Sequence, residues 1–418
     1  MREMKDSGIE WVGAMPRAWK MNTIAQIFLQ VKCKNTGLQE RNLLSLSYGK
    51  VKRKSIDTVE GLLPESFDGY NIIEKDDIVL RLTDLQNDHT SLRVGLAEER
   101  GIITSAYLTI RNRSNFCPKY LYYYLHSFDI AKGFYGMGAG VRQGLNWDGV
   151  KWLKILAPSV PEQERIAAFL DAECAEIDAV LEKTRASIEE YKKLKQAVIT
   201  QAVTKGIRGD RPMKDSGIEW IGDIPAEWDV IRVKQLLKER NERSKEGKEE
   251  PLSMSQKVGL VPTKFLESIP NMASSFVGAK LAYVDDLVFN KLKAHLGVFS
   301  VSRYDGLVSP DYAVYCSTGK SNLKYLEYIF KTPQCIGEFR KKSTGIAAGL
   351  MRLYTEGLFS IYLPYPALSE QEEIAEYLNE KCAGIDALIA KKQQYLTEIE
   401  NYKKSLIYEY VTGKKEVV

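Results

Sequence analysis

The segment from residue 161 to residue 206 reads PEQERIAAFLDAECAEIDAVLEKTRASIEEYKKLKQAVITQAVTKG, and the rest of the chain is organised around it. Two series of residues recur in this segment every seven positions, with the second offset from the first by four. The first series is Leu170, Ile177, Thr184, Tyr191 and Val198, and the second is Cys174, Leu181, Ile188, Lys195 and Ala202. A heptad seam of this kind predicts a long helix that pairs with another helix.

The same design returns at residues 369–413. Both copies interrupt the apolar stripe at the same heights, since Thr184 corresponds to Lys392 and Lys195 to Lys403. A lone copy would fit a solvated surface helix equally well, but a matched second copy favours pairing between the two. We expect the seam to be formed by the apolar positions Leu170, Ile177, Leu181, Ile188, Leu378, Ile385, Ile389 and Leu396.

Neither copy contains a proline after its first residue, and each ends at a glycine, Gly206 or Gly413, as is typical of a helix C-terminus. About 44 residues at 1.5 Å each extend over roughly 66 Å. The segment that joins the two copies holds about 140 residues between a repeated block and the second helix, and a globule of that size has a radius of gyration near 14 Å. Because it cannot span a helix length, we expect the two helices to pack antiparallel.

Length and composition exclude some classes of protein. A chain of 418 residues exceeds a single core, so at least two domains are expected. With 44% hydrophobic and 27% charged residues, no apolar run approaches the roughly 18 residues that span a bilayer. The N-terminal MREMKDSGIEW lacks the apolar core of a signal peptide, and the six cysteines show no C-x-x-C spacing. We therefore expect no membrane association, a cytoplasmic location and buried free thiols.

The opening residues 4–19 return almost letter for letter at residues 213–228. Each block carries two tryptophans and a proline at fixed offsets, which indicates a chain reversal held by aromatic burial. The second block directly follows the first helix, so the first block is expected beside the end of the second helix. The chain would then close on itself as a pseudo-ring.

Between block and helix lie residues 20–160 and 229–368, which read as two mixed α/β globules. Asp76–Leu80 and Asp285–Phe289 each predict a turn that leads into a strand. The β-rich runs at residues 102–110 and 307–315 predict further strands, and residues 119–121 and 324–326 predict helix starts. The fold class expected is mixed α/β, with two such domains joined by a long antiparallel two-helix coiled coil in a pseudo-two-fold internal repeat.

Catalytic and metal-binding patterns do not emerge. His89, His126 and His295 occur singly, without a second ligand at helical spacing, and no P-loop string is present. The glycine-rich run at residues 136–140 follows a tyrosine-rich helical stretch, which is the wrong context for a dinucleotide loop. Pro310-Asp311 lacks the acid-x-Lys partner of a nuclease motif. We expect no catalytic residues, no metal and no cofactor in this chain.

Basic and hydrogen-bonding residues gather in the turns of both globules, and these residue types read phosphates and base edges. In the first globule they are Tyr48, Lys50, Lys52, Arg53, Lys54, Arg81, Thr83, Asp84, Gln86, Asn87, Arg142 and Gln143. In the second they are Gln256, Lys257, Asn290, Lys291, Lys293, His295, Lys341, Lys342 and Ser343. Any single cluster fits a solvated surface, and a net charge of +4 decides nothing, but matching places in two globules favour a DNA-facing side.

Taken together, these motifs resemble those of the specificity subunits of type I restriction-modification enzymes, over essentially the full length. The resemblance rests on the opening pattern with its two tryptophans at 11 and 19, its repeat, and the string at residues 80–87, LRLTDLQN. It rests also on the proline- and glutamine-containing leads into the long helices, at residues 158–166 and 364–374. The second globule lacks the LRLTDLQN string, which makes its contact residues less certain than those of the first.

The resemblance implies a non-catalytic DNA-recognition subunit. Target-recognition domains at residues 1–160 and 207–368 would each read one half of a bipartite site in double-stranded DNA. Spacer helices at residues 161–206 and 369–413 would set the distance between the half-sites and dock two modification subunits, with residues 414–418 as a tail. S-adenosylmethionine, ATP and Mg are then expected on the modification and the restriction (motor-nuclease) subunits. The competing interpretation is a protein-binding scaffold with two recognition domains and no DNA role.

Overall fold

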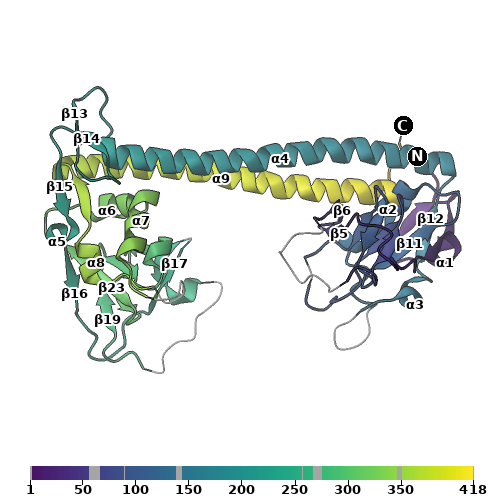
Figure 1. Ribbon diagram of the computed structural model, residues 1–418, viewed down its shortest axis with the longest axis horizontal. Coiled ribbons are helices and arrows are strands. Elements are labelled where there is room, and N and C mark those ends of the chain that lie inside the picture. Colours follow the sequence, from purple (N-terminus) through teal and green to yellow (C-terminus); the bar gives the residue numbers. More distant parts are fainter. Residues whose placement is uncertain are drawn as a thin grey trace. The chain divides into compact units, whose positions relative to one another are not determined.

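Two long helices, α4 (Val160–Lys205) and α9 (Leu368–Val411), carry the seam that the heptads predict. The computed structural model describes residues 2–55, 66–88, 90–137, 144–256, 258–266, 275–345 and 351–417. The chain divides into unit 1, residues 1–185 with 394–418, and unit 2, residues 186–393. Each long helix therefore begins in one unit and ends in the other. Figure 1 labels both helices.

Within unit 1 the two helices run antiparallel, because residues with increasing numbers along α4 contact residues with decreasing numbers along α9. Asp178 receives an ion pair from Lys403 at 2.6 Å, and Arg185 pairs with Glu400 at 2.6 Å. Leu170 and Leu406 lie in the same buried core of this unit. This arrangement agrees with the predicted antiparallel pairing.

Unit 2 shows the same direction of pairing. Lys195 forms an ion pair with Asp386 at 2.6 Å, and the Lys392 ammonium lies 5.7 Å from the centre of the Tyr191 ring. The lysines that interrupt the heptads, Lys195, Lys392 and Lys403, are thus each held by a residue of the other helix, and Thr184 donates its hydroxyl to the carbonyl of Val180 in its own helix. The eight apolar seam positions are all buried or half-buried: Leu170, Ile177, Leu181, Ile188, Leu378, Ile385, Ile389 and Leu396.

The helix ends follow the predicted stops. Gly206 directly follows α4 and Gly413 closely follows α9, with φ of 76° and 73°. Left-handed backbone of this kind is adopted readily only by glycine, which lets the chain leave the helix axis sharply.

The core of unit 1 is a four-stranded antiparallel sheet in the order β4-β11-β8-β9, packed against helix α2 (Pro118–Ile130) and the first half of α4. Its strands are β4 (Phe28–Gln30), β11 (Leu108–Asn112), β8 (Ile78–Leu80) and β9 (Val94–Leu96). Two-stranded pairs surround it: β1 (Met4–Asp6) with β2 (Ala14–Pro16), β3 (Lys20–Thr23) with β12 (Lys154–Ala157), β5 (Leu44–Ser47) with β6 (Lys50–Arg53), and β7 (Asn71–Ile73) with β10 (Gly101–Ile103). Short helices α1 (Ile24–Ile27) and α3 (Trp147–Val150) complete the unit.

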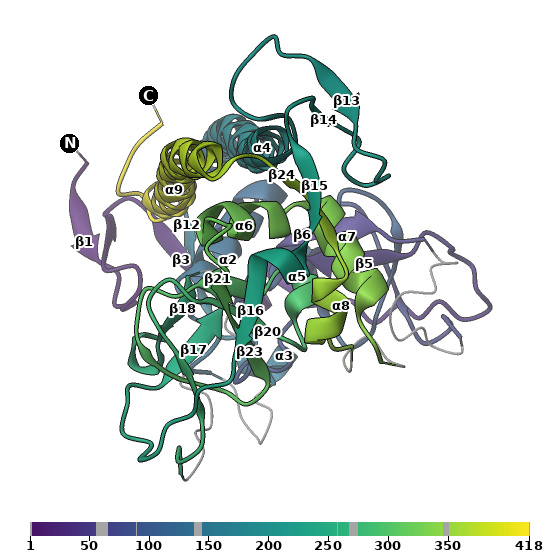
Figure 2. The same cartoon turned by 90° about the vertical axis from the view of Figure 1, so that its left-hand side faces the viewer.

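Unit 2 has a four-stranded antiparallel sheet in the order β16-β23-β20-β21; Figure 2 turns this unit toward the viewer. Its strands are β16 (Leu237–Arg240), β23 (Tyr312–Ser317), β20 (Leu287–Asn290) and β21 (Phe299–Val301). The pairs are β13 (Met213–Asp215) with β14 (Asp223–Pro225), β15 (Asp229–Arg232) with β24 (Tyr362–Tyr365), β17 (Leu252–Ser255) with β18 (Gly259–Pro262), and β19 (Lys280–Ala282) with β22 (Gly306–Val308). The helices are α5 (Val233–Leu236), η1 (Thr263–Phe265), η2 (Ala294–Leu296), α6 (Leu323–Phe330), α7 (Pro333–Lys342) and α8 (Thr355–Phe359).

The turns that lead into the central strands are where the sequence predicts them. Asp76 and Asp285 have φ of 70° and 68° just before β8 and β20. The β-rich runs at residues 102–110 and 307–315 are not single strands, however. Each splits between two sheets, because a turn at residues 104–107 or 309–312 separates β10 from β11 and β22 from β23.

The opening block packs where the second long helix ends. Trp19 is buried and donates its indole N–H to Glu162 in the first turn of α4 at 3.2 Å, and the Arg2 guanidinium lies over the same ring. Tyr408 of α9 donates its hydroxyl to the carbonyl of Val12 at 3.3 Å. The first block therefore lies beside the end of the second helix, as predicted.

The repeated block makes matching contacts in unit 2. Trp228 donates its indole N–H to Glu370 in the first turn of α9 at 2.9 Å, and the Arg211 guanidinium lies over the ring at 5.1 Å. In both units the block fixes the start of a long helix.

Candidate nucleic-acid interface

A polar loop at residues 81–88 follows the central strand β8 in unit 1. Leu82 and Leu85 are buried and anchor the loop in the core below it. The hydrogen-bonding residues alternate with these anchors and therefore face outward. Thr83, Gln86 and Asn87 are exposed, and Arg81 and Asp84 are half-buried.

The shape of this loop is held by contacts among its own polar groups. Asp84 has a φ of 57°, a left-handed conformation in which aspartate is more common than most residues, and its carboxylate accepts from the Asn87 amide at 2.8 Å. The Arg81 guanidinium lies 3.6 Å from the Asp88 carboxylate. Hydrogen bonds from the side chain and backbone of Ser91 hold the pKa of Asp88 well below its usual range, so this carboxylate is charged at neutral pH.

An open depression of about 630 Å³ lies on this surface and is lined by Thr83, Asp84, Asn87 and Gly144. Three of these residues offer hydrogen-bonding side chains, and Gly144 offers only its backbone, which together suit a base edge or a phosphate. The predicted contacts Arg142 and Gln143 fall outside the residues that the structure describes.

The basic cluster of unit 1 lies on the β5–β6 hairpin. Tyr48 occupies the two-residue turn with a φ of 48° and is 84% exposed. Lys52 and Lys54 lie on the exposed surface. Arg53 forms two hydrogen bonds with Glu99, and Lys50 lies 3.5 Å from Asp178 of α4. The hairpin thus offers fewer unengaged charges than its sequence suggests.

In unit 2 the loop after the central strand β20 occupies the corresponding topological place. The Asn290 side chain accepts from the backbone N–H of Leu292 at 3.1 Å and shapes the turn. Lys291 is half-buried and donates to the carbonyl of Pro310 at 3.2 Å, while Lys293 is exposed. His295 is buried at 8% exposure in η2, so its imidazole lies inside the unit and not on its surface.

Residues far apart in sequence meet this loop. Gln256 donates to the carbonyl of Leu296 at 3.3 Å, and Arg340 of α7 donates to the carbonyl of His295 at 3.4 Å. Lys341 pairs with Glu338 at 2.7 Å, Lys342 is exposed, and Ser343 donates to the carbonyl of Phe339. Lys257 falls outside the described residues. The structure therefore brings the Gln256, Asn290–His295 and Arg340–Ser343 groups to one side of unit 2.

Groups that could hold a metal ion were sought in the described parts of the chain. There, no cluster of three or more His, Cys, Asp or Glu side chains has a metal-binding arrangement. In the same parts, no helix is both long and apolar enough to cross a bilayer.

Comparisons with known proteins give relatives of one kind. The chain is 24% identical over 283 residues to the type I restriction enzyme MjaVIII specificity subunit of Methanocaldococcus jannaschii, and 22% identical over 290 residues to the EcoDI specificity subunit of Escherichia coli. These matches cover 63% of this chain and 63% and 62% of the two relatives, so the chain spans less than two thirds of either. No model of a protein family matches the chain.

Solved structures share the fold over nearly the whole chain. A chain from a study of complex assembly and conformational transition of the type I R-M system has a TM-score of 0.70 at 14% identity, covering 96% of this chain and 99% of that one. The HsdS subunit from Thermoanaerobacter tengcongensis has a TM-score of 0.51 at 14% identity, with 96% and 98% covered. The predicted resemblance to type I specificity subunits is confirmed.

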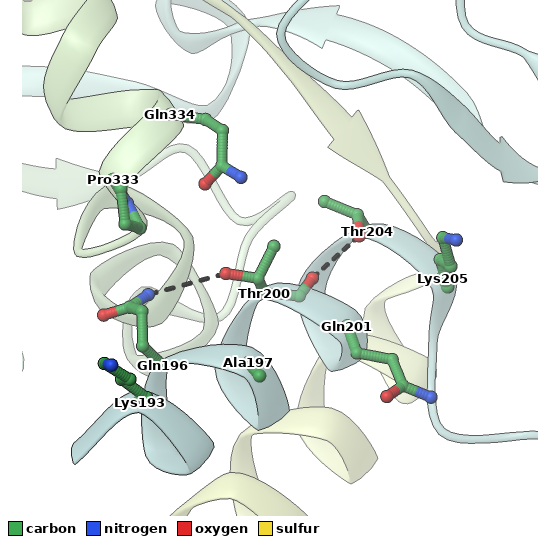
Figure 3. Close-up of a pocket in the computed structure, with 9 residues that line it drawn as sticks. All are labelled: Lys193, Gln196, Ala197, Thr200, Gln201, Thr204, Lys205, Pro333 and Gln334. Atoms are coloured by element: carbon green, nitrogen blue, oxygen red, sulfur yellow. Dashed lines mark hydrogen bonds between the residues drawn. The ribbon is translucent and has the colours of Figure 1, made fainter. Parts of the chain in front are cut away.

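One further recess of this chain lies on the long helix α4. An open groove of about 720 Å³ follows α4 toward its C-terminal end and reaches the start of α7 (Figure 3). The residues that line it include two lysines, three glutamines and two threonines, and the full set is Lys193, Gln196, Ala197, Thr200, Gln201, Thr204, Lys205, Pro333 and Gln334. Gln196 and Thr200 hydrogen-bond to each other along the helix face, so the groove displays side chains from successive turns.

Two residues that support the polar loop of unit 1 were not predicted from the sequence. Arg93 and Tyr135 lie under the loop at residues 81–88 and bind its backbone. A lone arginine before a short strand and a tyrosine in an aromatic-rich stretch carry no pattern that points to such contacts. Only the fold brings them beneath a loop that ends five residues before Arg93.

Proposed function

We propose that this chain is the DNA sequence-recognition subunit of a type I restriction-modification complex. The observation that carries the proposal is that two relatives, from an archaeon and a bacterium, are both type I specificity subunits. The geometry supports it, because each unit presents a polar loop at the end of the central strand of its sheet. Arg, Lys, Asn and Gln in such loops are the residues that read base edges and hold phosphates.

In this proposal each unit reads one half of a bipartite target in double-stranded DNA. The recognition domains are residues 1–160 and 207–368, the spacer helices are residues 161–206 and 369–413, and residues 414–418 form a tail. We propose that the predicted DNA contacts belong to these two domains. The first candidates are the exposed residues Lys52, Gln86, Asn87, Lys293 and Lys342.

The two halves are proposed to be a pseudo-two-fold internal repeat. Several pairs of equivalent contacts support this. Trp19 binds Glu162 as Trp228 binds Glu370, and both glutamates lie in the first turn of a long helix. The seam ion pairs Asp178–Lys403 and Lys195–Asp386 join equivalent positions with the roles of the helices exchanged.

Catalysis is assigned to partner subunits. Two modification subunits would dock on the long helices, bind S-adenosylmethionine and methylate adenine. Restriction subunits would use ATP and Mg to move along and cut unmodified DNA. The groove beside α4 and α7 is a candidate part of the docking surface, because the lysines and glutamines that line it are exposed or half-buried.

A binding assay with the assembled complex tests the proposal. The chain is co-expressed with its modification subunits, the methylated motif is read by single-molecule sequencing of the host DNA, and a duplex carrying that motif is compared with a scrambled one. We expect at least about a thousandfold preference for the motif, with affinity that falls as salt rises. Equal binding to both duplexes, or no adenine methylation that depends on this chain, would favour the protein-binding scaffold instead.

A further inference from the structure

Arg93 is fully buried beneath the loop at residues 81–88, immediately before strand β9. All five of its guanidinium N–H groups have an acceptor within hydrogen-bonding distance. Nε donates to the Tyr135 hydroxyl at 3.1 Å. The other four go to backbone carbonyl oxygens of the loop: Nη1 to Arg81 (3.1 Å) and Thr83 (2.8 Å), and Nη2 to Asp84 (3.3 Å) and Asp88 (2.5 Å).

A guanidinium in this position needs a reason, because a charge removed from water is costly unless it is paired and hydrogen-bonded. An arginine has five N–H donors in a fixed planar fork, and here the loop curls around that fork. The curl requires the left-handed backbone of Asp84. The shape of the loop and the shape of the guanidinium therefore match.

Further contacts attach Arg93 to the rigid parts of unit 1. Its backbone N–H donates to the Asp129 carboxylate on α2 at 2.6 Å, and its guanidinium stacks 4.9 Å from the centre of the Tyr135 ring. The Tyr135 hydroxyl also donates to the carbonyl of Asp88 at 3.1 Å. The loop is thus connected to helix α2 and to β9 through a single residue, whose side chain binds the loop and whose backbone binds α2.

We propose that Arg93 is a positioning residue that sets the shape of the loop at residues 81–88 and thereby the bases that unit 1 selects. This inference rests on the proposed DNA-recognition function. Arg93 itself touches no DNA, because it has no exposed surface. It binds the backbone carbonyls of Thr83 and Asp84, whose side chains line the open depression described above. Fixing that backbone fixes the directions in which the side chains present their donors and acceptors.

In unit 2 the position that corresponds to Arg93 is apolar. Val298 stands before β21 as Arg93 stands before β9, and it is a buried apolar residue. The turn after β20 is shaped instead by the Asn290 side chain. The effect of Arg93 should therefore be confined to one half of the target.

The test uses the complete complex and the motif found by methylation sequencing. Arg93→Lys keeps the charge but has three donors in place of five, so it cannot bind all four carbonyls. Affinity is measured for the intact motif and for duplexes altered in each half-site in turn. We expect discrimination at one half-site to fall about tenfold, which is within the range for a base contact, and discrimination at the other to stay unchanged. The affected half-site should be the one that Arg81→Ala also alters.

Two further variants separate positioning from general loss of stability. Tyr135→Phe retains the ring but removes the hydroxyl that binds both Arg93 and Asp88, and it should weaken the same half-site discrimination by a smaller factor. Arg111→Lys is the matched control, because Arg111 binds the Asp77 carboxylate through two 2.7 Å hydrogen bonds in the same sheet without touching the loop. It should lower the melting temperature without a half-site effect.

The outcomes separate the two claims. If the wild-type complex selects its motif and Arg93→Lys keeps full discrimination at both half-sites, the positioning role is wrong. An equal loss at both half-sites, matched by Arg111→Lys, also overturns it. If the wild-type complex itself selects no sequence, the proposed function fails instead.

Discussion

The exposed cations of unit 1 differ in whether a carboxylate of the same unit already holds them. Lys50 and Arg53 are paired with Asp178 and Glu99, whereas Lys52 is exposed at the surface of the same hairpin. A cation that must leave a carboxylate to bind a phosphate contributes less free energy of DNA binding than a cation that is surrounded only by water. Among these residues we therefore expect unequal contributions to DNA binding.

Replacing Lys52, Arg53 and Lys54 together by alanine should weaken binding to every DNA sequence. The slope of log affinity against log salt should fall by up to about 0.9 for each lost phosphate contact. Lys50→Ala and Arg53→Ala are the single-residue controls, and each should change the slope little, because Asp178 and Glu99 already hold these two cations. Titrations at several salt concentrations measure these slopes. A triple variant with the wild-type slope would remove this hairpin from the DNA surface.

Arg81→Ala should change sequence choice more than affinity. Arg81 stands at the start of the loop, half-buried, and its guanidinium is oriented by Asp88 at 3.6 Å. An oriented guanidinium discriminates guanine from other bases by about 1–3 kcal/mol. Methylation sequencing of a host carrying the variant should show one relaxed position in one half-site. An unchanged motif together with unchanged affinity would show that Arg81 reads no base.

His126 makes the stability of unit 1 depend on pH. Burial, and to a smaller extent the nearby charge of Lys403, together lower the pKa of His126 from its ordinary value of 6.5 to about 4. The unfolded chain therefore binds a proton more readily than the folded one. The contribution is fully present above about pH 6.5 and is lost as the pH falls toward about 4, by at most about 3 kcal/mol.

His126→Phe keeps the aromatic stacking on Tyr122 and removes this proton linkage. Between pH 7 and pH 5 the wild type should lose more unfolding free energy than the variant, as measured by denaturant titration. Asp129 acts in the opposite direction, because burial raises its pKa to about 6, but it is common to both proteins and cancels in the difference. Parallel stability curves for the two proteins would contradict the assignment.

Among the elements, the long helices owe their ends to glycine. Gly413 follows α9 with a φ of 73°, and a Cβ there would lie 2.5 Å from Pro16 and 2.9 Å from Trp19. Gly37 has nearly the same backbone, with a φ of 76°, but a Cβ there would meet nothing within 4 Å. The two positions separate backbone strain from crowding.

Gly37→Ala should therefore cost only the strain of left-handed backbone, about 1–2 kcal/mol. Gly413→Ala should cost that strain and a further 1–3 kcal/mol for overpacking against the opening block. Thermal unfolding of both variants measures the difference. Equal losses of stability would mean that the block does not pack against the end of α9 as described.

For the whole molecule, the spacer hypothesis makes a mechanical prediction. Both long helices pass from one unit into the other, between residues 185 and 186 and between residues 393 and 394. Four residues inserted after Thr184, with a matching four after Lys392, add about one turn, or roughly 6 Å, at polar positions of the seam. At about 3.4 Å per base pair this is close to two base pairs.

The lengthened chain should methylate a motif with unchanged half-sites and a spacer longer by one or two base pairs, as read by methylation sequencing. The single insertions are controls, because lengthening one helix alone mismatches the seam and should lower stability and activity. A lengthened spacer is the expected result only for the paired insertion. An unchanged spacer, or altered bases within a half-site, would count against the helices as a ruler.

The sequence by itself determined the parts of this protein that depend on local periodicity. Heptads predict both long helices because an apolar stripe made of two positions in every seven must be buried along its whole length. Glycine marks the helix ends because few other residues adopt left-handed backbone. The aspartate turns before β8 and β20 were predictable for a similar local reason. The resemblance to type I specificity subunits also needed no structure.

Tertiary structure alone decided how the polar residues are used. The runs at residues 102–110 and 307–315 divide between sheets because strand pairing, which is non-local, overrides a continuous β-rich pattern. The pairing of Arg53 with Glu99 and the burial of His295 depend on distant segments that composition cannot place. Arg93 is the clearest case, since five hydrogen-bond acceptors converge on one guanidinium only after α2, β9 and the loop have packed together.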